Sequence, residues 1–257
     1  FLLEPVSAEN LVNNRNSRNF WCNVKGIGSW SLTGNAAEAL SKKFTEMQDD
    51  SEVTAGFMWQ KTTRESKKYQ LRGEILSFIP VEKNVEVMLV TITNTGRMAQ
   101  TVTPTAAIPL YGRSADNIRD HRHVTSLLHR IETTDTGVLV TPTLSFDERG
   151  HQVNHMTYYC VGWSGNGENP VDFYPTAEDF VGEGGNFERP YAIVKNAEGV
   201  KAGTRIEGLE AVGGLHFSEV TLEPEEECSY LIFTGITEDI QEIRNLSKTY
   251  TTREMVL

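Results

Sequence analysis

The chain lacks several features that would assign a protein to a class at once. It has no apolar run of the ~18 residues that cross a bilayer as a helix, so no membrane span is expected. Its three cysteines, Cys22, Cys160 and Cys228, are far apart and form no CxxC pair. They therefore indicate neither a disulfide framework nor a zinc knuckle, and they favour a reducing compartment, here taken as the cytoplasm.

Positive charge is also scarce. The chain has 24 Lys and Arg against 35 Asp and Glu, which gives a net charge of −11. This balance disfavours nucleic acid and anionic membrane surfaces as partners, whereas neutral ligands such as sugars remain open. There is no initiator methionine and no signal-like apolar segment, and the first residues, Phe1 to Val6, read as the middle of a sequence. We therefore expect a piece of a longer protein.

Most of the chain has the sequence pattern of β-strands. At 257 residues and 39% hydrophobic content, the chain can bury a sizeable core as one large β domain or two small domains. Apolar and β-branched runs, separated at short intervals by Gly, Asn and Pro, predict strands over residues 51–59, 69–78, 86–93, 101–110, 137–141, 157–163, 209–212, 215–222 and 229–234. Within residues 101–110, Pro104 and Pro109 favour an edge position or a neighbouring bulge. This spacing indicates an antiparallel sandwich rather than βαβ units. The predicted core includes Val87, Leu89, Ile92, Phe217, Leu231 and Phe233.

Helical patterns are few and short. Residues 36–47 predict one turn or a short helix, and Thr176 is placed to cap a turn that begins with an acidic pair. Residues 237–246 carry an N-cap, early acids and apolar residues at helical spacing, which predicts a helix leading toward a further domain. The segment 163–189 combines glycine and proline with aromatic side chains, so it is expected to pack against the rest of the domain.

The densest polar chemistry lies between Pro109 and Arg130. This segment carries Arg113, Asp116, Arg119, Asp120, His121, Arg122, His123, His129 and Arg130. Burying a charge costs several kcal/mol unless it is paired, so we expect a hydrogen-bonded network that fixes the loop, or contact with a sugar or partner domain. The network is expected to pair Arg113, Arg119 or Arg122 with Asp116, Asp120, Asp147 or Glu148. A metal site built from these histidines or from His151 and His155 is disfavoured, because no cysteine accompanies them and Arg119 and Arg122 would repel a cation. No metal and no cofactor are expected.

Three other patterns have a functional and a structural interpretation. Hydrolysis of a glycoside needs two acids ~5–10 Å apart, and Asp147 with Glu148, or Glu183 with Glu188, could be nominated. Acids are so abundant here that some pair always qualifies, so no catalytic residue is assigned. The run 182–185 is predicted to be a tight turn rather than a phosphate cradle, because neither a helix nor a lysine follows. Residues 13–19 suit sugar hydroxyls, with Phe20, Trp21 and Trp30 as stacking faces, but core aromatics are the favoured interpretation.

Taken in order along the chain, several of these motifs carry a resemblance. The run 85–94 after Phe78-Ile-Pro-Val-Glu, together with Gly112-Arg-Ser-Ala-Asp-Asn, Asp120-His-Arg-His, Phe146-Asp-Glu-Arg-Gly-His and Asp179-Phe-Val-Gly-Glu-Gly-Gly, resembles the N-terminal domain of glycoside hydrolase family 94. This family contains the cellobiose-phosphorylase-like enzymes formerly grouped as glycosyltransferase family 36, and the motifs are most similar to its oligoglucan-phosphorylase-like branch. The resemblance covers residues 13–243 approximately.

The resemblance implies an all-β, antiparallel supersandwich related to galactose mutarotase, over residues 1–236, with a short C-terminal linker helix beginning at residues 237–257. In the family a helical toroid follows, which carries the catalytic aspartate and most of the phosphate site. The chain is therefore expected to be the non-catalytic domain of a phosphorylase of β-glucan oligosaccharides, inactive alone. It would serve assembly, including a homodimer, and shaping of the sugar site. Carbohydrate or inter-domain contact is assigned to Arg113, Asp116, Asp120, His121, Arg122, His123, Asp147, Glu148 and His151.

Two alternatives of other classes stay open. A free-standing carbohydrate-binding module would bind isolated glucan without any further domain. A mutarotase-like sugar epimerase would need a histidine and a glutamate facing one sugar, for which His216 with Glu219 or Glu207 are the candidates.

Overall fold

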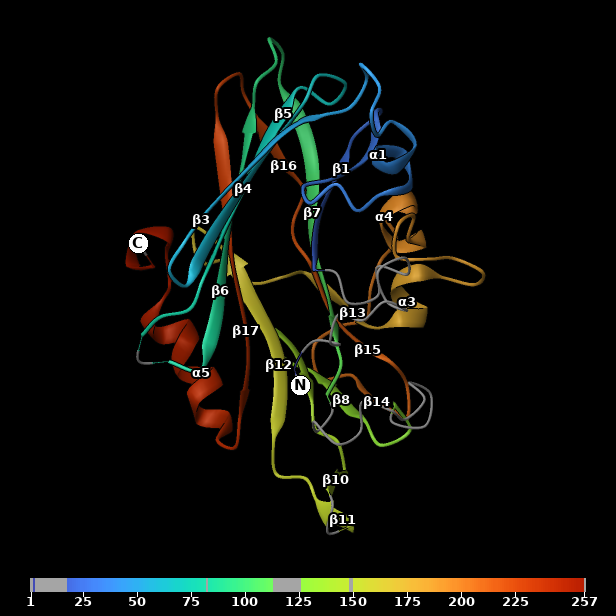
Figure 1. Ribbon diagram of the computed structural model, residues 1–257, viewed down its shortest axis with the longest axis vertical. Coiled ribbons are helices and arrows are strands. Elements are labelled where there is room, and N and C mark those ends of the chain that lie inside the picture. Colours follow the sequence, from blue (N-terminus) through green and yellow to red (C-terminus); the bar gives the residue numbers. More distant parts are fainter. Residues whose placement is uncertain (1, 3–17, 82, 113–125, 148–149, 257) are drawn as a thin grey trace.

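The computed structural model describes residues 2, 18–81, 83–112, 126–147 and 150–256, and within them the protein is mostly antiparallel β structure. The described strands form one six-stranded sheet, one nine-stranded sheet and one hairpin, and every strand pair is antiparallel. Figure 1 shows the two large sheets face to face, with helices on their outer sides. This confirms the all-β, antiparallel supersandwich expected from the sequence.

The six-stranded sheet has the order β13-β15-β7-β1-β2, with β16 also paired to β7. Its strands are β1 (Asn19–Val24), β2 (Gly28–Ser31), β7 (Gln100–Leu110), β13 (Asp172–Thr176), β15 (Ala211–His216) and β16 (Val220–Leu222). The strand β7 lies in the middle, so the edge position predicted for residues 101–110 is wrong, whereas the alternative, a neighbouring bulge, is confirmed: residues 103–104 lie opposite three residues, 217–219. Pro104 is tolerated there because it lies opposite the break between β15 and β16, where its carbonyl accepts a hydrogen bond from the Phe217 N–H (3.0 Å).

The nine-stranded sheet has the order β14-β8-β9-β12-β17-β6-β5-β4-β3. Its strands are β3 (Asp50–Gly56), β4 (Trp59–Ser66), β5 (Leu71–Phe78), β6 (Val85–Asn94), β8 (Arg130–Thr133), β9 (Gly137–Val140), β12 (Thr157–Ser164), β14 (Arg205–Glu207) and β17 (Glu227–Thr237). The remaining hairpin joins β10 (Leu144–Asp147) to β11 (Gly150–Val153), and Figure 1 shows it projecting from one end of the molecule.

Two predicted strands are in fact interrupted. Residues 51–59 are not one strand, because the chain turns at Phe57 and Met58 and Trp59 begins β4. Residues 215–222 are split into β15 and β16 by the break at 217–219. At the first turn the apolar residues Phe57 and Met58 continue the hydrophobic pattern, so this pattern alone does not show the turn.

The helices are short and lie outside the sheets. They are α1 (Ala37–Ser41), α3 (Ala177–Val181), α4 (Tyr191–Lys195), α5 (Ile240–Thr249) and the 3₁₀ turn η2 (Arg253–Met255). The cap predicted for α3 is confirmed, since Thr176 Oγ1 accepts a hydrogen bond from the Asp179 N–H at 3.1 Å. For α5 the N-cap is Asp239 rather than Thr237.

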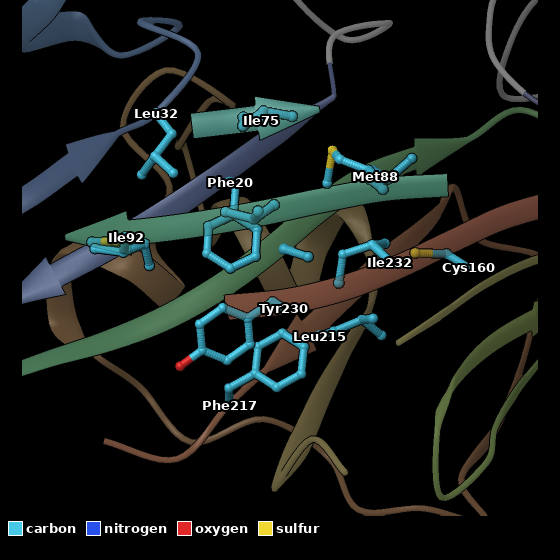
Figure 2. Packing of buried hydrophobic residues seen from close by; sticks show 14 of the residues in the cluster. Phe20, Leu32, Ile75, Met88, Ile92, Cys160, Leu215, Phe217, Tyr230 and Ile232 are labelled. Carbon is cyan, nitrogen blue, oxygen red and sulfur yellow. The ribbon is translucent and has the colours of Figure 1, made fainter. Parts of the chain in front are cut away.

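Both faces of the central strands are buried, which gives three hydrophobic clusters. The largest fills the space between the two sheets, where Phe20, Ile92, Phe217 and Ile232 meet (Figure 2). A second lies between the nine-stranded sheet and α5, and a third lies between the six-stranded sheet and α3 with α4. All six predicted core residues are buried, but Val87, Leu89, Leu231 and Phe233 belong to the cluster under α5. The helix α5 thus packs back on the sandwich through Ile243 and Leu246.

The aromatic segments of uncertain role are also part of the fold. Phe20, Trp21 and Trp30 are buried in β1 and β2, which confirms them as core aromatics. The segment 163–189 supplies β13 and α3. Aromatic rings from these two elements pack together in the cluster on the outer face of the six-stranded sheet. Gly182 and Gly184 have positive φ and the Gly185 N–H donates to the Gly182 carbonyl, so the predicted tight turn is confirmed.

Candidate functional site

The two polar segments singled out in the sequence leave the sandwich at one corner. The first begins after Gly112, whose left-handed φ of 59° suits glycine. A Cβ at Gly112 would lie 3.1 Å from Nε2 of His129, so the described chain before residue 113 lies close to the described chain after residue 125. The β10–β11 hairpin starts beside them, because the Thr143 N–H donates to the Leu128 carbonyl at 2.9 Å.

This corner is held by buried and paired groups. The His129 side chain is buried, and its Nδ1 lies 3.1 Å from the carbonyl oxygen of Leu209. Next to it, Nε of Arg130 lies 3.3 Å from an oxygen of Glu207. The Asn154 N–H donates to the Thr143 carbonyl at 3.3 Å and closes the base of the hairpin. The corner can therefore act as a fixed base for both polar segments.

Most of the predicted contact residues lie outside the described residues. These are Arg113, Asp116, Asp120, His121, Arg122, His123 and Glu148. Asp147 ends β10, and His151 is exposed in β11, opposite Phe146. The pairing predicted to order the loop, of Arg113, Arg119 or Arg122 with Asp116, Asp120, Asp147 or Glu148, also falls outside them. It stays a prediction, together with the assigned sugar or inter-domain role of all nine residues.

The histidine considered for mutarotase chemistry has a different partner from those proposed. His216 is buried in β15, and its Nδ1 lies 2.7 Å from Oδ1 of Asp172. The hydroxyl of Tyr174 is 3.4 Å from the same nitrogen. Sequence reasoning missed Asp172, because only the register of β13 on β15 brings this residue opposite His216.

The two glutamates nominated beside His216 are engaged elsewhere. Glu219 lies 3.2 Å from Nζ of Lys25, and Glu207 pairs with Arg130. Both glutamates are largely exposed, whereas His216 is buried. The structure therefore brings neither pair together as a sugar epimerase would need.

A polar cleft of about 340 Å³ lies at the rim of the sandwich, lined by the loop 164–169 and the start of β17. Three of its four carboxylates have partners: Glu219 pairs with Lys25, Glu227 with Arg253 at 2.5 Å, and Glu226 accepts a hydrogen bond from the Glu223 N–H at 2.8 Å; the fourth is Glu168. The three paired carboxylates hold the fold together, so the cleft does not present the free acid and base of a glycosidase.

An ionic network lies where α1 meets the turn between β4 and β5. Oε1 of Glu38 lies 2.6 Å from Nζ of Lys42 and 2.7 Å from Nζ of Lys68, and the Tyr69 hydroxyl donates to Oε2 at 2.7 Å. Burial by itself would raise the pKa of the Glu38 carboxyl, but the hydrogen bonds from these three groups prevail and lower it to about 2. Burial and the adjacent Glu38 raise the pKa of Tyr69. The network is structural, because it ties the hairpin turn to α1.

The described residues also lack a cluster of metal ligands and a membrane-spanning helix. Within them, no group of three or more His, Cys, Asp or Glu side chains is arranged to hold a metal ion. Within the same ranges, each helix is too short or too polar to span a bilayer.

Comparison with protein families finds one match that covers nearly the whole chain. Residues 17–253 match the family described as "Glycosyl hydrolase 94, supersandwich domain". Among curated proteins, none matches the chain.

Solved structures with a similar fold are remote in sequence. A bacterial glucoamylase solved with acarbose has a TM-score of 0.50 at 9% identity, and the match covers 90% of this chain and 28% of that one. A polysaccharide lyase has a TM-score of 0.42 at 11% identity, over 89% of this chain and 26% of the lyase. The chain thus spans less than a third of the glucoamylase, and this likeness concerns the fold alone.

Proposed function

Because the chain belongs to the family of the glycosyl hydrolase 94 supersandwich domain, we propose that it is the non-catalytic domain of a glycoside phosphorylase acting on β-glucan oligosaccharides. Its role is to support assembly and to present two polar segments, 113–125 and 146–151, to the sugar site of the whole enzyme. The observation that carries this proposal is the common corner from which both segments leave the sandwich, against His129 and Thr143.

The chemistry of the described residues favours a supporting role over catalysis. Phosphorolysis needs a positioned general acid and a site for an anion. Three of the four carboxylates of the rim cleft are already paired, and His216 is held by Asp172. With a net charge of −11, the chain also repels phosphate outside locally basic segments. The segment that begins at Arg113 combines Arg113, Arg119 and Arg122 with two histidines, so it is the part we assign to the sugar or the neighbouring domain.

The test is a phosphorolysis assay on the purified chain and on the full-length enzyme. We expect no release of glucose 1-phosphate when the chain alone is incubated with β-linked glucose disaccharides or oligosaccharides and phosphate. In the full-length enzyme, Arg113→Ala or Asp120→Asn should lower kcat/KM while leaving Tm unchanged. Release of glucose 1-phosphate by the chain alone, abolished by Asp147→Asn, would move catalysis into this domain and overturn the proposal.

A further inference from the structure

The strand β3 is the longest edge strand of the two described sheets. All seven of its residues are exposed, and among the described strands it pairs only with β4. The other edge strands are shorter: β14 and β16 have three residues, β2 has four, and β13 has five, of which Phe173 is also bridged to Val200. A long uncovered edge is a template for a further strand, and for this reason proteins usually keep their edges short or covered.

The open side of β3 presents the backbone groups of alternate residues. The loop between β3 and β4 has two residues, so Gly56 and Trp59, which flank it, form a hydrogen-bonded pair. Every second residue counted back from Gly56 therefore bonds to β4, and the N–H and C=O groups of Ser51, Val53 and Ala55 point to the open side. Within the described ranges, none of these three residues has a backbone hydrogen bond to a turn or loop.

The sequence of β3 is complementary to itself in an antiparallel pair centred on Val53. In this register Val53 lies opposite Val53 of a second copy, Glu52 lies opposite Thr54, and Asp50 lies opposite Gly56. Both acids of the strand thus face uncharged residues, and the two branched valine side chains, each 65% exposed in the single chain, meet on one face. A parallel pair in register would instead place each acid beside its own copy, which is destabilising.

The exposed apolar residues at the two ends of β3 fit the same two-fold symmetry. At the tip of the hairpin, Phe57 is 91% exposed and Met58 is 43% exposed. At its foot, shortly before β3 begins, Phe44 is 89% exposed and Met47 is 69% exposed. An antiparallel pair of β3 strands brings the tip of each hairpin toward the foot of the other. Contact between these ends removes a large apolar area from water.

We propose that two copies of this chain pair edge to edge through β3, as a two-fold dimer centred on Val53. The free backbone groups of Ser51 in one copy bond to those of Ala55 in the other, and the two Val53 residues bond to each other. The two nine-stranded sheets then continue into one another. A strand of another protein could use the same edge, but the second copy is favoured because it matches both the acids and the apolar ends.

This surface is separate from the corner described above. In the strand order β3 lies at one end of the nine-stranded sheet, whereas the corner lies next to β8, near the opposite end. The inference goes beyond the proposed function, because it follows from the free edge, the charges and the exposed ends of β3, and not from a sugar site. Its failure leaves the phosphorylase assignment untouched, since association and phosphorolysis are measured by different assays.

Analytical ultracentrifugation of the purified chain over a range of concentrations tests the association. We expect an equilibrium between monomer and dimer with a dissociation constant on the order of 10 μM, because one pair of edge strands is a small interface. Phe57→Ser, which removes the apolar ring at the tip, should weaken the dimer several-fold.

Charge substitutions at the two-fold axis test the register. Val53→Lys places two like charges opposite each other, so it should raise the dissociation constant at least tenfold, and Val53→Glu should do the same. An equimolar mixture of the two variants should dimerise again, because lysine then faces glutamate. This recovery requires that residue 53 of one copy faces residue 53 of the other, and misfolding cannot produce it.

The matched control is Val153→Lys, which adds the same charge at a valine of the same 65% exposure in β11. It should dimerise as the parent does, and all three variants should keep the Tm of the parent, because both valines are exposed. A chain that stays monomeric at every concentration would overturn the proposal and leave the edge to a strand of another protein. A dimer that survives Val53→Lys, that is weakened equally by Val153→Lys, or that is not recovered in the mixture would overturn it as well.

Discussion

The centre of the nine-stranded sheet and its β3 end have the same antiparallel hydrogen bonding but differ in how far their side chains are buried. The strands β12, β17 and β6 are buried on both faces, one against the six-stranded sheet and the other against α5. The strand β3 has eight-residue β4 as its partner and nothing described on either face. Backbone pairing alone places a strand in the sheet, whereas the burial of its side chains decides how much the strand contributes to stability. Stability should therefore be concentrated at the covered centre, and the open edge should contribute little to it.

The largest effect should come from the covered centre. Phe233 is fully buried, and its ring lies 4.9 Å from that of Trp163 and 5.6 Å from that of Tyr250. Phe233→Ala should cost about 3–5 kcal/mol of unfolding free energy, since it leaves a cavity under α5. Urea denaturation followed by circular dichroism measures this. A loss below about 1 kcal/mol would mean that α5 does not cover the sheet in solution.

A matched pair of valines tests the comparison within one sheet. Val87 is 1% exposed in β6, and Val53 is 65% exposed in β3. Val87→Ala should lower the free energy of unfolding by about 2 kcal/mol, because a buried valine loses apolar contacts. Val53→Ala should change it by less than about 0.5 kcal/mol. Equal losses from the two variants, measured by the same urea titration, would show that the edge hairpin is covered in solution.

The ionic network at the foot of the hairpin gives a pH-dependent effect. The folded pKa of Glu38 is about 2, below its ordinary value of 4.5, so its stabilisation is present above pH 4.5 and is lost as the pH falls through 2. The Glu38 side chain is 35% exposed, and solvent screening reduces the contribution to about 1 kcal/mol. Glu38→Gln should therefore be less stable than the parent at pH 7, and the difference should vanish near pH 2. A difference that stays constant across this range would exclude the carboxylate charge as its cause.

The smallest effect concerns the turn at the tip. Met58 has a φ of 60°, a left-handed conformation that costs a residue with a Cβ about 1–2 kcal/mol. Part of this is offset in Met58→Gly by the greater backbone freedom of glycine in the unfolded chain, so the net gain should be about 0.5 kcal/mol. Met98→Gly is the control, because Met98 is also exposed but is not among the residues with positive φ, and this change should not stabilise. Thermal unfolding of both variants checks the sign.

The sequence was informative where local chemistry decides the structure. The β-branched run 86–93, the Thr176 cap and the glycine turn at 182–185 all follow from short-range rules, and each is present in the fold. The all-β class followed from the spacing of such runs. By contrast, the split at Phe57 and Met58 was missed, because neither residue is a usual turn former.

The candidate site could be predicted less completely, since its geometry depends on contacts between distant segments. The pairing of His216 with Asp172 arises from the register of β15 on β13, which joins residues 44 positions apart in the chain. No local pattern encodes this contact. The corner at Gly112 and His129 is a second example. The polar residues can be read from the sequence, but the sequence does not show that the two polar segments leave the sandwich at the same corner.

The order of the strands along the chain also determines which strands can pair first during folding. The strands β3 to β6 follow one another directly, so that part of the nine-stranded sheet can form as soon as its residues are available. The strand β7 has β1 on one side and waits for β15, which comes about a hundred residues later in the chain, on the other. Until β15 is made, β7 presents an open apolar edge, and loop closure over that distance is slow. During synthesis this half-built sheet is the species that a chaperone would need to shield from aggregation.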